Sequence, residues 1–165
     1  DIELAALLTE VNSNTEIDTN TLSMVAMTKI SDQDGKVVPT PAQNTQIQNA
    51  LYGKFLTNNM QAIFINPGDT KAMQQVTDKL SSVAKTLDIK IQVRGSLESI
   101  ASSATELANQ LESRYFVSPN NIANLRAIAA WATYIKKQGT FVDTDAANKA
   151  WEELTNNMPS NLRFQ

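Results

Sequence analysis

The sequence predicts a mixed α/β (α+β) fold, in which an N-terminal hairpin and a βαβ unit are followed by a part made of three helices. Two patterns carry this prediction. Residues 62–93 contain a short apolar run, a stretch with apolar residues three and four positions apart, and a run that alternates between apolar and polar residues. That order is typical of strand, helix and strand. From Leu97 onward, three further stretches show helical spacing with no strand pattern between them.

The chain is expected to divide into an acidic helical arm with its linker, residues 1–21, and a single α/β domain, residues 22–165, whose C-terminal half (about 96–158) is helical. A length of 165 residues suits one hydrophobic core. Residues 1–20 hold five acidic residues and no Lys or Arg, so they carry −5, while the whole chain carries −3. Four apolar residues of the arm lie at helical spacing: Leu4, Leu7, Leu8 and Val11. The three leucines are candidate interface residues. Such a helix can pack on its own domain or on a neighbouring copy.

Residues 22–38 are expected to form the hairpin, because a partly alternating apolar run precedes the turn-forming residues from Asp32 to Gly35 and a short β-branched run follows them. Thr40 followed by Pro41 is typical of a helix start. The helix that begins there is expected to run to about Thr57.

The βαβ unit is predicted in three pieces. Residues 62–65 (AIFI) form the first strand, residues 70–87 carry one apolar face and form the helix, and residues 89–93 (IKIQV) alternate and form the second strand. The crossover between two parallel strands of this kind is right-handed.

The turn at Gly68, Asp69 and Thr70 is a candidate ligand site. In α/β proteins, ligands commonly bind beyond the carboxyl end of a strand and at a helix N-terminus. The turn lacks the several glycines that cradle a phosphate, and Asp69 would repel an anion. Asp69 or Thr70 acting as a helix N-cap explains the same residues without a ligand.

Three helices are expected in the C-terminal half, at about 97–111, 119–138 and 144–157. Ser118 and Pro119 open the second helix and Gly139 closes it, while Pro159 follows the third. Alanines in the second helix allow its neighbours to approach closely.

Four aromatic residues in this half are candidate interface residues: Tyr115, Phe116, Trp131 and Trp151. Packing in the core is the usual role of aromatic side chains at such places, and anchoring a partner is the alternative.

The composition excludes most common catalytic constellations, because the chain contains no His and no Cys. A Ser-His-Asp triad, a Cys-His pair, a His- or Cys-bearing metal site and a disulfide all need residues that are absent. We therefore expect no cofactor and no tightly bound metal ion, and no catalytic residue can be named.

The surface is expected to be neutral and polar, because charged residues make up 19% of the chain against about 25% in an average soluble domain. Such a surface loses little on self-association. No clustered basic stripe indicates nucleic-acid binding, and no apolar stretch is long enough to span a membrane. We expect a soluble protein, for which a virion, the cytoplasm and the periplasm are all compatible locations.

The run Asn161 to Gln165 resembles the residues that viral chymotrypsin-like cysteine proteases leave upstream of a cut, since these enzymes commonly require Gln before the scissile bond. A chance sequence explains it as well.

Two functions from different classes remain. The first is a non-enzymatic structural or assembly protein that acts by self-association or by contact with other proteins, such as a component of a virion, a phage or a secretion apparatus. The alternative is a small α/β ligand-binding module, or an enzyme that uses carboxylates and lysine, with its site near the turn from Asn66 to Thr70. The first is favoured by the missing catalytic residues, the neutral surface and the acidic arm.

Overall fold

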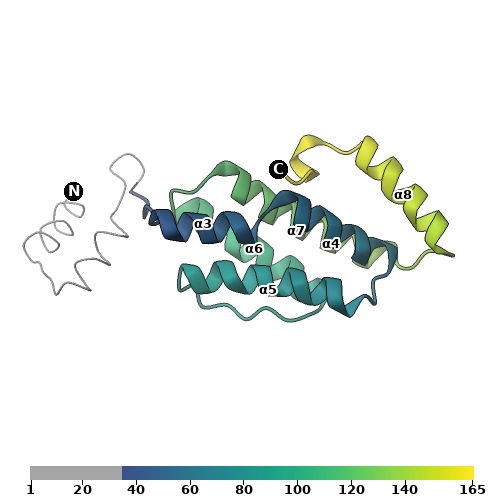
Figure 1. Cartoon of the computed structure of the whole chain (residues 1–165), viewed down its shortest axis with the longest axis horizontal. Helices are drawn as coiled ribbons and strands as arrows, with labels where there is room; N and C mark the ends of the chain where they lie inside the picture. The colour runs from purple at the N-terminus through teal and green to yellow at the C-terminus, as the bar shows by residue number, and fades with distance from the viewer. Residues whose placement is uncertain (1–34) are drawn as a thin grey trace, which may run out of the picture.

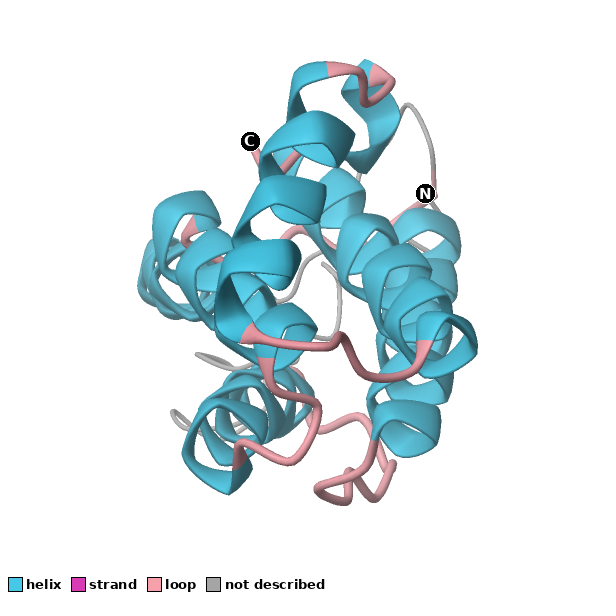
Figure 2. Ribbon diagram, turned by 90° about the vertical axis from the view of Figure 1, so that its right-hand side faces the viewer, coloured by secondary structure: helices cyan, strands magenta, loops and turns pink. Residues whose placement is uncertain are grey.

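The computed structural model describes residues 35–165, and this part of the chain is built from helices and connecting loops (Figure 1). α3 and α4 follow one another along the long axis with α5 beside them, and α8 lies at the end farthest from residue 35 (Figure 1). Figure 2 looks down this axis and shows how the helices surround one core. The elements are α3 (Pro41–Ala50), α4 (Gly53–Ile65), α5 (Thr70–Thr86), α6 (Leu97–Arg114), α7 (Pro119–Gln138), α8 (Thr144–Asn156) and the short 3-10 helix η1 (Ser160–Leu162).

The predicted α/β class is wrong, because the structure has no β-strand between residues 35 and 165. Residues 62–65, expected as the first strand, are the last turn of α4. Ile63 and Phe64 are both buried there. A run of four apolar residues fits a buried helix as well as a buried strand, and here the helix that begins at Gly53 continues through it. Because residues 62–65 and 89–93 are not strands, the predicted right-handed crossover between them is absent as well.

The second expected strand, residues 89–93, is an extended connection between α5 and α6. Its backbone has no ladder partner among residues 35–165: the Ile89 N–H donates to the Ala84 carbonyl at 2.8 Å and the Ile91 N–H to the Ile89 carbonyl at 3.1 Å. Ile89 is buried and Ile91 half-buried, with exposed polar residues between and after them. The alternation in the sequence is therefore the pattern of a segment lying along the helices, not of a strand in a sheet.

The predicted hairpin lies mostly outside the described residues, and the part that is described pairs elsewhere. Val37 forms an isolated parallel bridge with Tyr115. The Val37 N–H donates to the Arg114 carbonyl and the Phe116 N–H donates to the Val37 carbonyl, both at 2.8 Å. These bonds join the start of the described chain to the link between α6 and α7.

The helix expected from Thr40 to about Thr57 begins as predicted but is interrupted. The Thr40 Oγ1 accepts from the Gln43 N–H and the Gln43 Oε1 accepts from the Thr40 N–H, both at 2.9 Å, which is a complete capping box. α3 ends at Ala50 and α4 begins at Gly53.

The interruption accommodates contacts with distant parts of the chain. The Leu51 carbonyl accepts a hydrogen bond of 2.8 Å from the Nδ2 of Asn124 on α7. A Cβ at Gly53 would overlap the carbonyl oxygen of Gln165, so only glycine fits beside the C-terminal residue. The break between α3 and α4 is thus the place where the C-terminal residues rest on the helices.

The three helices expected after residue 96 are present as α6, α7 and α8. α6 and α7 share the most extensive helix-to-helix contact of the described part. Small buried side chains let them approach, namely Ala104, Ala108, Ala127 and Ala132. The core that results includes residues of every α-helix described, from Ile47 of α3 to Trp151 of α8.

Candidate functional site

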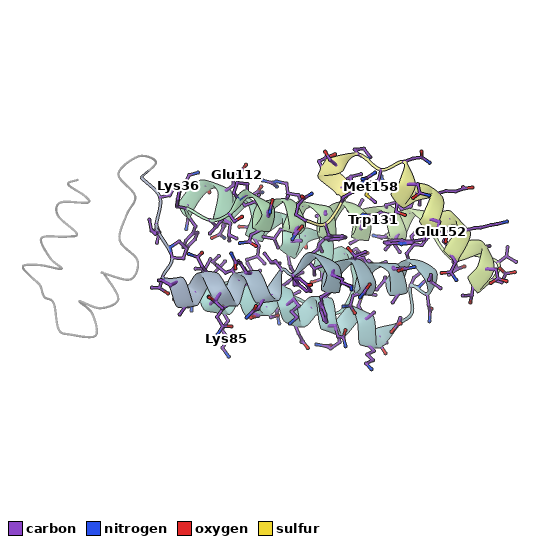
Figure 3. The ribbon with its side chains drawn as sticks, turned by 45° about the horizontal axis from the view of Figure 1, so that its top comes forward. Lys36, Lys85, Glu112, Trp131, Glu152 and Met158 are labelled. Carbon is purple, nitrogen blue, oxygen red and sulfur yellow. The ribbon has the colours of Figure 1, made fainter. Side chains whose placement is uncertain are left out.

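The candidate site is a groove between α7, α8 and the residues that follow α8. It has a volume of about 550 Å³ and opens to solvent. We call it the aromatic groove. Apolar side chains form most of its lining, with three polar residues at its rim: Ala130, Trp131, Tyr134, Phe141, Ala150, Leu154, Met158, Pro159 and Leu162, with Gln138, Glu153 and Asn157. Figure 3 shows Trp131 and Met158 together at this end of the molecule, with Glu152 on α8 nearby.

The aromatic side chains that line the groove belong to a larger cluster of packed rings that continues beneath it. Trp131 and Trp151 have ring centroids 4.6 Å apart, and Phe64 lies 5.9 Å from Trp131 at an interplanar angle of 86°. Phe141, from the loop between α7 and α8, lies 5.0 Å from Phe64. Rings packed in this way add about 0.5–1.5 kcal/mol per pair beyond their burial, so the cluster holds Trp131 and Phe141 in place at the groove.

One side of the groove is held by a hydrogen bond to the indole of Trp131. Its Nε1 donates to the Leu162 carbonyl at 3.0 Å. Beyond Leu162, the Gln165 N–H donates to the Asn124 Oδ1 at 2.6 Å. The C-terminal residues are therefore attached to α7 at two points, and Leu162 contributes its side chain to the groove.

Tyr134 stands at the open side of the groove with 38% of its surface exposed. Its hydroxyl donates to the Gln138 Oε1 at 2.9 Å, and its ring stacks on Phe64 at 6.3 Å. An aromatic ring with one buried face and one open face is the kind of side chain that anchors protein contacts.

The predicted interface aromatics are divided between two places. Trp131 is buried and lines the aromatic groove, and Trp151 is buried against Trp131 without lining the groove itself. Tyr115 and Phe116 lie together in the link between α6 and α7, where Phe116 is 52% exposed. Burial raises the pKa of Tyr115, whose hydroxyl donates to the Leu87 carbonyl at 3.3 Å. Leu4, Leu7 and Leu8 lie outside the described residues.

Tyr134 and Phe141 were not predicted as site residues. Tyr134 follows Trp131 by three positions and so shares its side of the helix, a signal that the sequence does carry. Phe141 belongs to the loop after Gly139 and follows no periodic pattern.

The turn at Gly68, Asp69 and Thr70 connects two helices and does not follow a strand. Asp69 is the N-cap of α5, and its Oδ1 accepts from the Ala72 N–H at 3.0 Å. The Asn66 Oδ1 accepts from the Gly68 N–H at 3.1 Å. Both polar side chains are engaged within the turn, as in an ordinary helix start.

Charged groups do not converge in the described part of the chain. Its ion pairs are all at the surface, and the pair from the Lys136 Nζ to the Glu98 Oε2, at 2.7 Å, joins α7 to α6. The hydrogen bond and the charge of Lys136 lower the pKa of Glu98. No group of three or more acidic side chains between residues 35 and 165 is arranged to hold a metal ion.

Residues 35–165 therefore form an all-helical fold with an apolar groove on its C-terminal helices. No protein-family model, curated protein or solved structure matches the chain. Among the described helices, none has the length and apolar character that crossing a membrane requires.

Proposed function

We propose that this protein acts by self-association, and that the aromatic groove is the surface through which copies meet. The observation that carries the proposal is the groove itself, an open apolar depression of about 550 Å³ with Tyr134 at its edge. Partly exposed apolar side chains surround it, including Leu154 and Met158 of the α8 end. Apolar surface of this kind is stabilised when a partner covers it.

The charge balance supports contact between identical copies. The whole chain carries −3, and charged residues make up 19% of it, so two copies repel each other weakly. Within the lining of the groove, Glu153 is the one charged side chain, and it stands at the rim. Closure of the groove by a second molecule would therefore remove little charge from water.

The alternative function, a ligand site near the turn from Asn66 to Thr70, has less support. The side chains of Asn66 and Asp69 already accept hydrogen bonds from nearby backbone N–H groups. A ligand there would have to displace a helix cap, which costs about 0.5–2 kcal/mol.

The test measures molar mass in solution by light scattering and by sedimentation, for the whole chain over a range of concentrations. We expect an oligomer that dissociates on dilution. Leu154→Glu and Tyr134→Glu each place a second carboxylate near Glu153 in the apolar surface, and each should weaken association by about tenfold or more. The matched control is Ser81→Glu, which adds the same charge at an exposed position of α5.

Circular dichroism verifies that every variant keeps its helical content. A whole chain that stays monomeric at high concentration would refute self-association. Two folded groove variants that associate like the unaltered chain would show that another surface is used.

A further inference from the structure

A second groove lies beside the point at which the described chain begins. It has a volume of about 570 Å³, and its apolar lining comes from the link between α6 and α7 and from the start of α7. We call it the Phe116 groove, after its exposed aromatic residue. The residues that matter to its chemistry are Tyr115, Phe116, Val117, Ile122, Lys36 and Arg126.

We propose that the Phe116 groove binds residues 1–11 of the same chain, with the apolar side of that segment against Phe116. This inference is independent of the proposed self-association, which uses the aromatic groove. It rests on three observations: the spacing and charge of residues 1–11, the charge of the groove, and the place from which the preceding chain departs.

The segment has the right chemistry for an apolar groove. Leu4, Leu7, Leu8 and Val11 fall on one side when the segment is helical, and no Lys or Arg occurs among residues 1–20. A helix of this length is marginal alone in water and needs a surface on which to pack.

Charge distinguishes this groove from two other grooves of the described part. The lining of the Phe116 groove holds Lys36 and Arg126 with Glu112, a net of one positive charge. The lining of the aromatic groove holds a single carboxylate, Glu153. A third groove, between α6 and α7, holds two acidic and two basic side chains. An acidic segment is therefore attracted by the Phe116 groove and repelled by the aromatic groove, and the charges of the third groove balance.

The preceding chain departs from the edge of the groove. The backbone of Val37 is bonded to Arg114 and to Phe116, and Lys36 lines the groove. Figure 3 shows Lys36 and Glu112 close together on this side, with Lys85 on the opposite side. A random-coil chain as long as residues 12–35 has a typical span of roughly 27 Å, so the covalent connection alone gives residues 1–11 a high effective concentration at the groove.

The absence of cysteine gives a direct test, since two introduced thiols are the only ones in the molecule. Ala5→Cys lies beside the leucines of the segment, and Ala123→Cys places the second thiol in the groove. In dilute protein under mild oxidation, we expect an intramolecular disulfide to form about tenfold or more faster in this pair than in the control pair Ala5→Cys with Ser81→Cys. Mass spectrometry identifies the linked peptides, and a non-reducing gel separates monomers from dimers.

Two further variants examine the chemistry of docking. In the chain with Ala5→Cys and Ala123→Cys, adding Leu4→Ser and Leu8→Ser should slow disulfide formation to the rate of the control pair. Lys36→Glu should slow it as well, whereas Lys85→Glu, at an exposed position of α5, should not.

Equal rates for the two cysteine pairs would overturn the proposal. Linked dimers in place of linked monomers would also overturn it, because the segment would then occupy the groove of a second copy. The proposed function fails separately: a chain that is monomeric at high concentration, yet closes the disulfide quickly, refutes self-association and leaves the docked segment intact.

Discussion

Asn124 of α7 forms hydrogen bonds to Leu51, at the break between α3 and α4, and to Gln165. Replacing it with Ala should therefore lower the free energy of unfolding. The side chain is 2% exposed. Its Nδ2 donates to the Leu51 carbonyl at 2.8 Å, and its Oδ1 accepts from the Gln165 N–H at 2.6 Å. The contact from the Nδ2 to the Gln165 carbonyl, at 3.5 Å, is too long to add much.

Asn124→Ala removes both short bonds and leaves the Leu51 carbonyl without a donor at the break between α3 and α4. Each lost bond costs about 0.5–1.5 kcal/mol net, and a buried polar group without a partner costs about 1–3 kcal/mol. We therefore expect a loss of about 2–4 kcal/mol. Urea unfolding followed by circular dichroism measures it, and Asn58→Ala, at an exposed position of α4, should change stability by no more than about 0.5 kcal/mol.

A double-mutant cycle separates the two bonds of Asn124. In a chain that ends at Arg163, the bond to Gln165 is already lost, so Asn124→Ala should cost about 1 kcal/mol less than in the whole chain. A loss below about 1 kcal/mol in the whole chain would refute the reasoning, as would a cost that is unchanged by the truncation.

Two other predictions concern single contacts. Gly53→Ala should lower the free energy of unfolding by about 1–3 kcal/mol, because its methyl group would overlap the carbonyl of Gln165, and the loss should nearly vanish in the chain that ends at Arg163. The Glu98 carboxylate has a lowered pKa in the folded state, so its ion pair with Lys136 stabilises the fold above the unfolded pKa and stops doing so as the pH falls through the folded pKa. Lys136→Gln should return the Glu98 pKa toward its ordinary value, which NMR titration of the carboxyl carbon reads directly; an unchanged titration curve would rule out the pair in solution.

Helix starts were the most predictable part of this fold, because they depend on residues close in sequence. Thr40 with Pro41 and Ser118 with Pro119 begin α3 and α7, and Gly139 follows the end of α7 as expected. A side chain that satisfies free N–H groups of a first turn acts within three or four residues, whatever the rest of the chain does.

The fold class was not predictable in the same way, because residues 62–65 and 89–93 have patterns that two structures satisfy. Whether an apolar run becomes a strand depends on a partner strand elsewhere, and no such partner exists in residues 35–165. The alternation of residues 89–93 marks one covered side and one exposed side, which an extended loop on helices also has.

The aromatic groove could be predicted only in part. Trp131 and Trp151 were identified as candidates, but the wall formed by Met158 to Leu162 depends on the return of the chain to α7. That return rests on the bonds of Asn124 and Trp131, whose partners lie tens of residues away. Local spacing carries no information about such pairs.

The attachment of the C-terminal residues to α7 has a consequence for the order in which the chain folds during synthesis. α6 and α7 are adjacent in sequence and can pair while the ribosome is still adding residues, because their contacts are local. The break between α3 and α4 receives a hydrogen bond from Asn124 of α7, and its remaining contact forms only when Gln165 packs beside Asn124 and Gly53. We therefore expect the junction of α3 and α4 to reach its final packing only after residue 165 has left the exit tunnel, later than the pairing of α6 with α7.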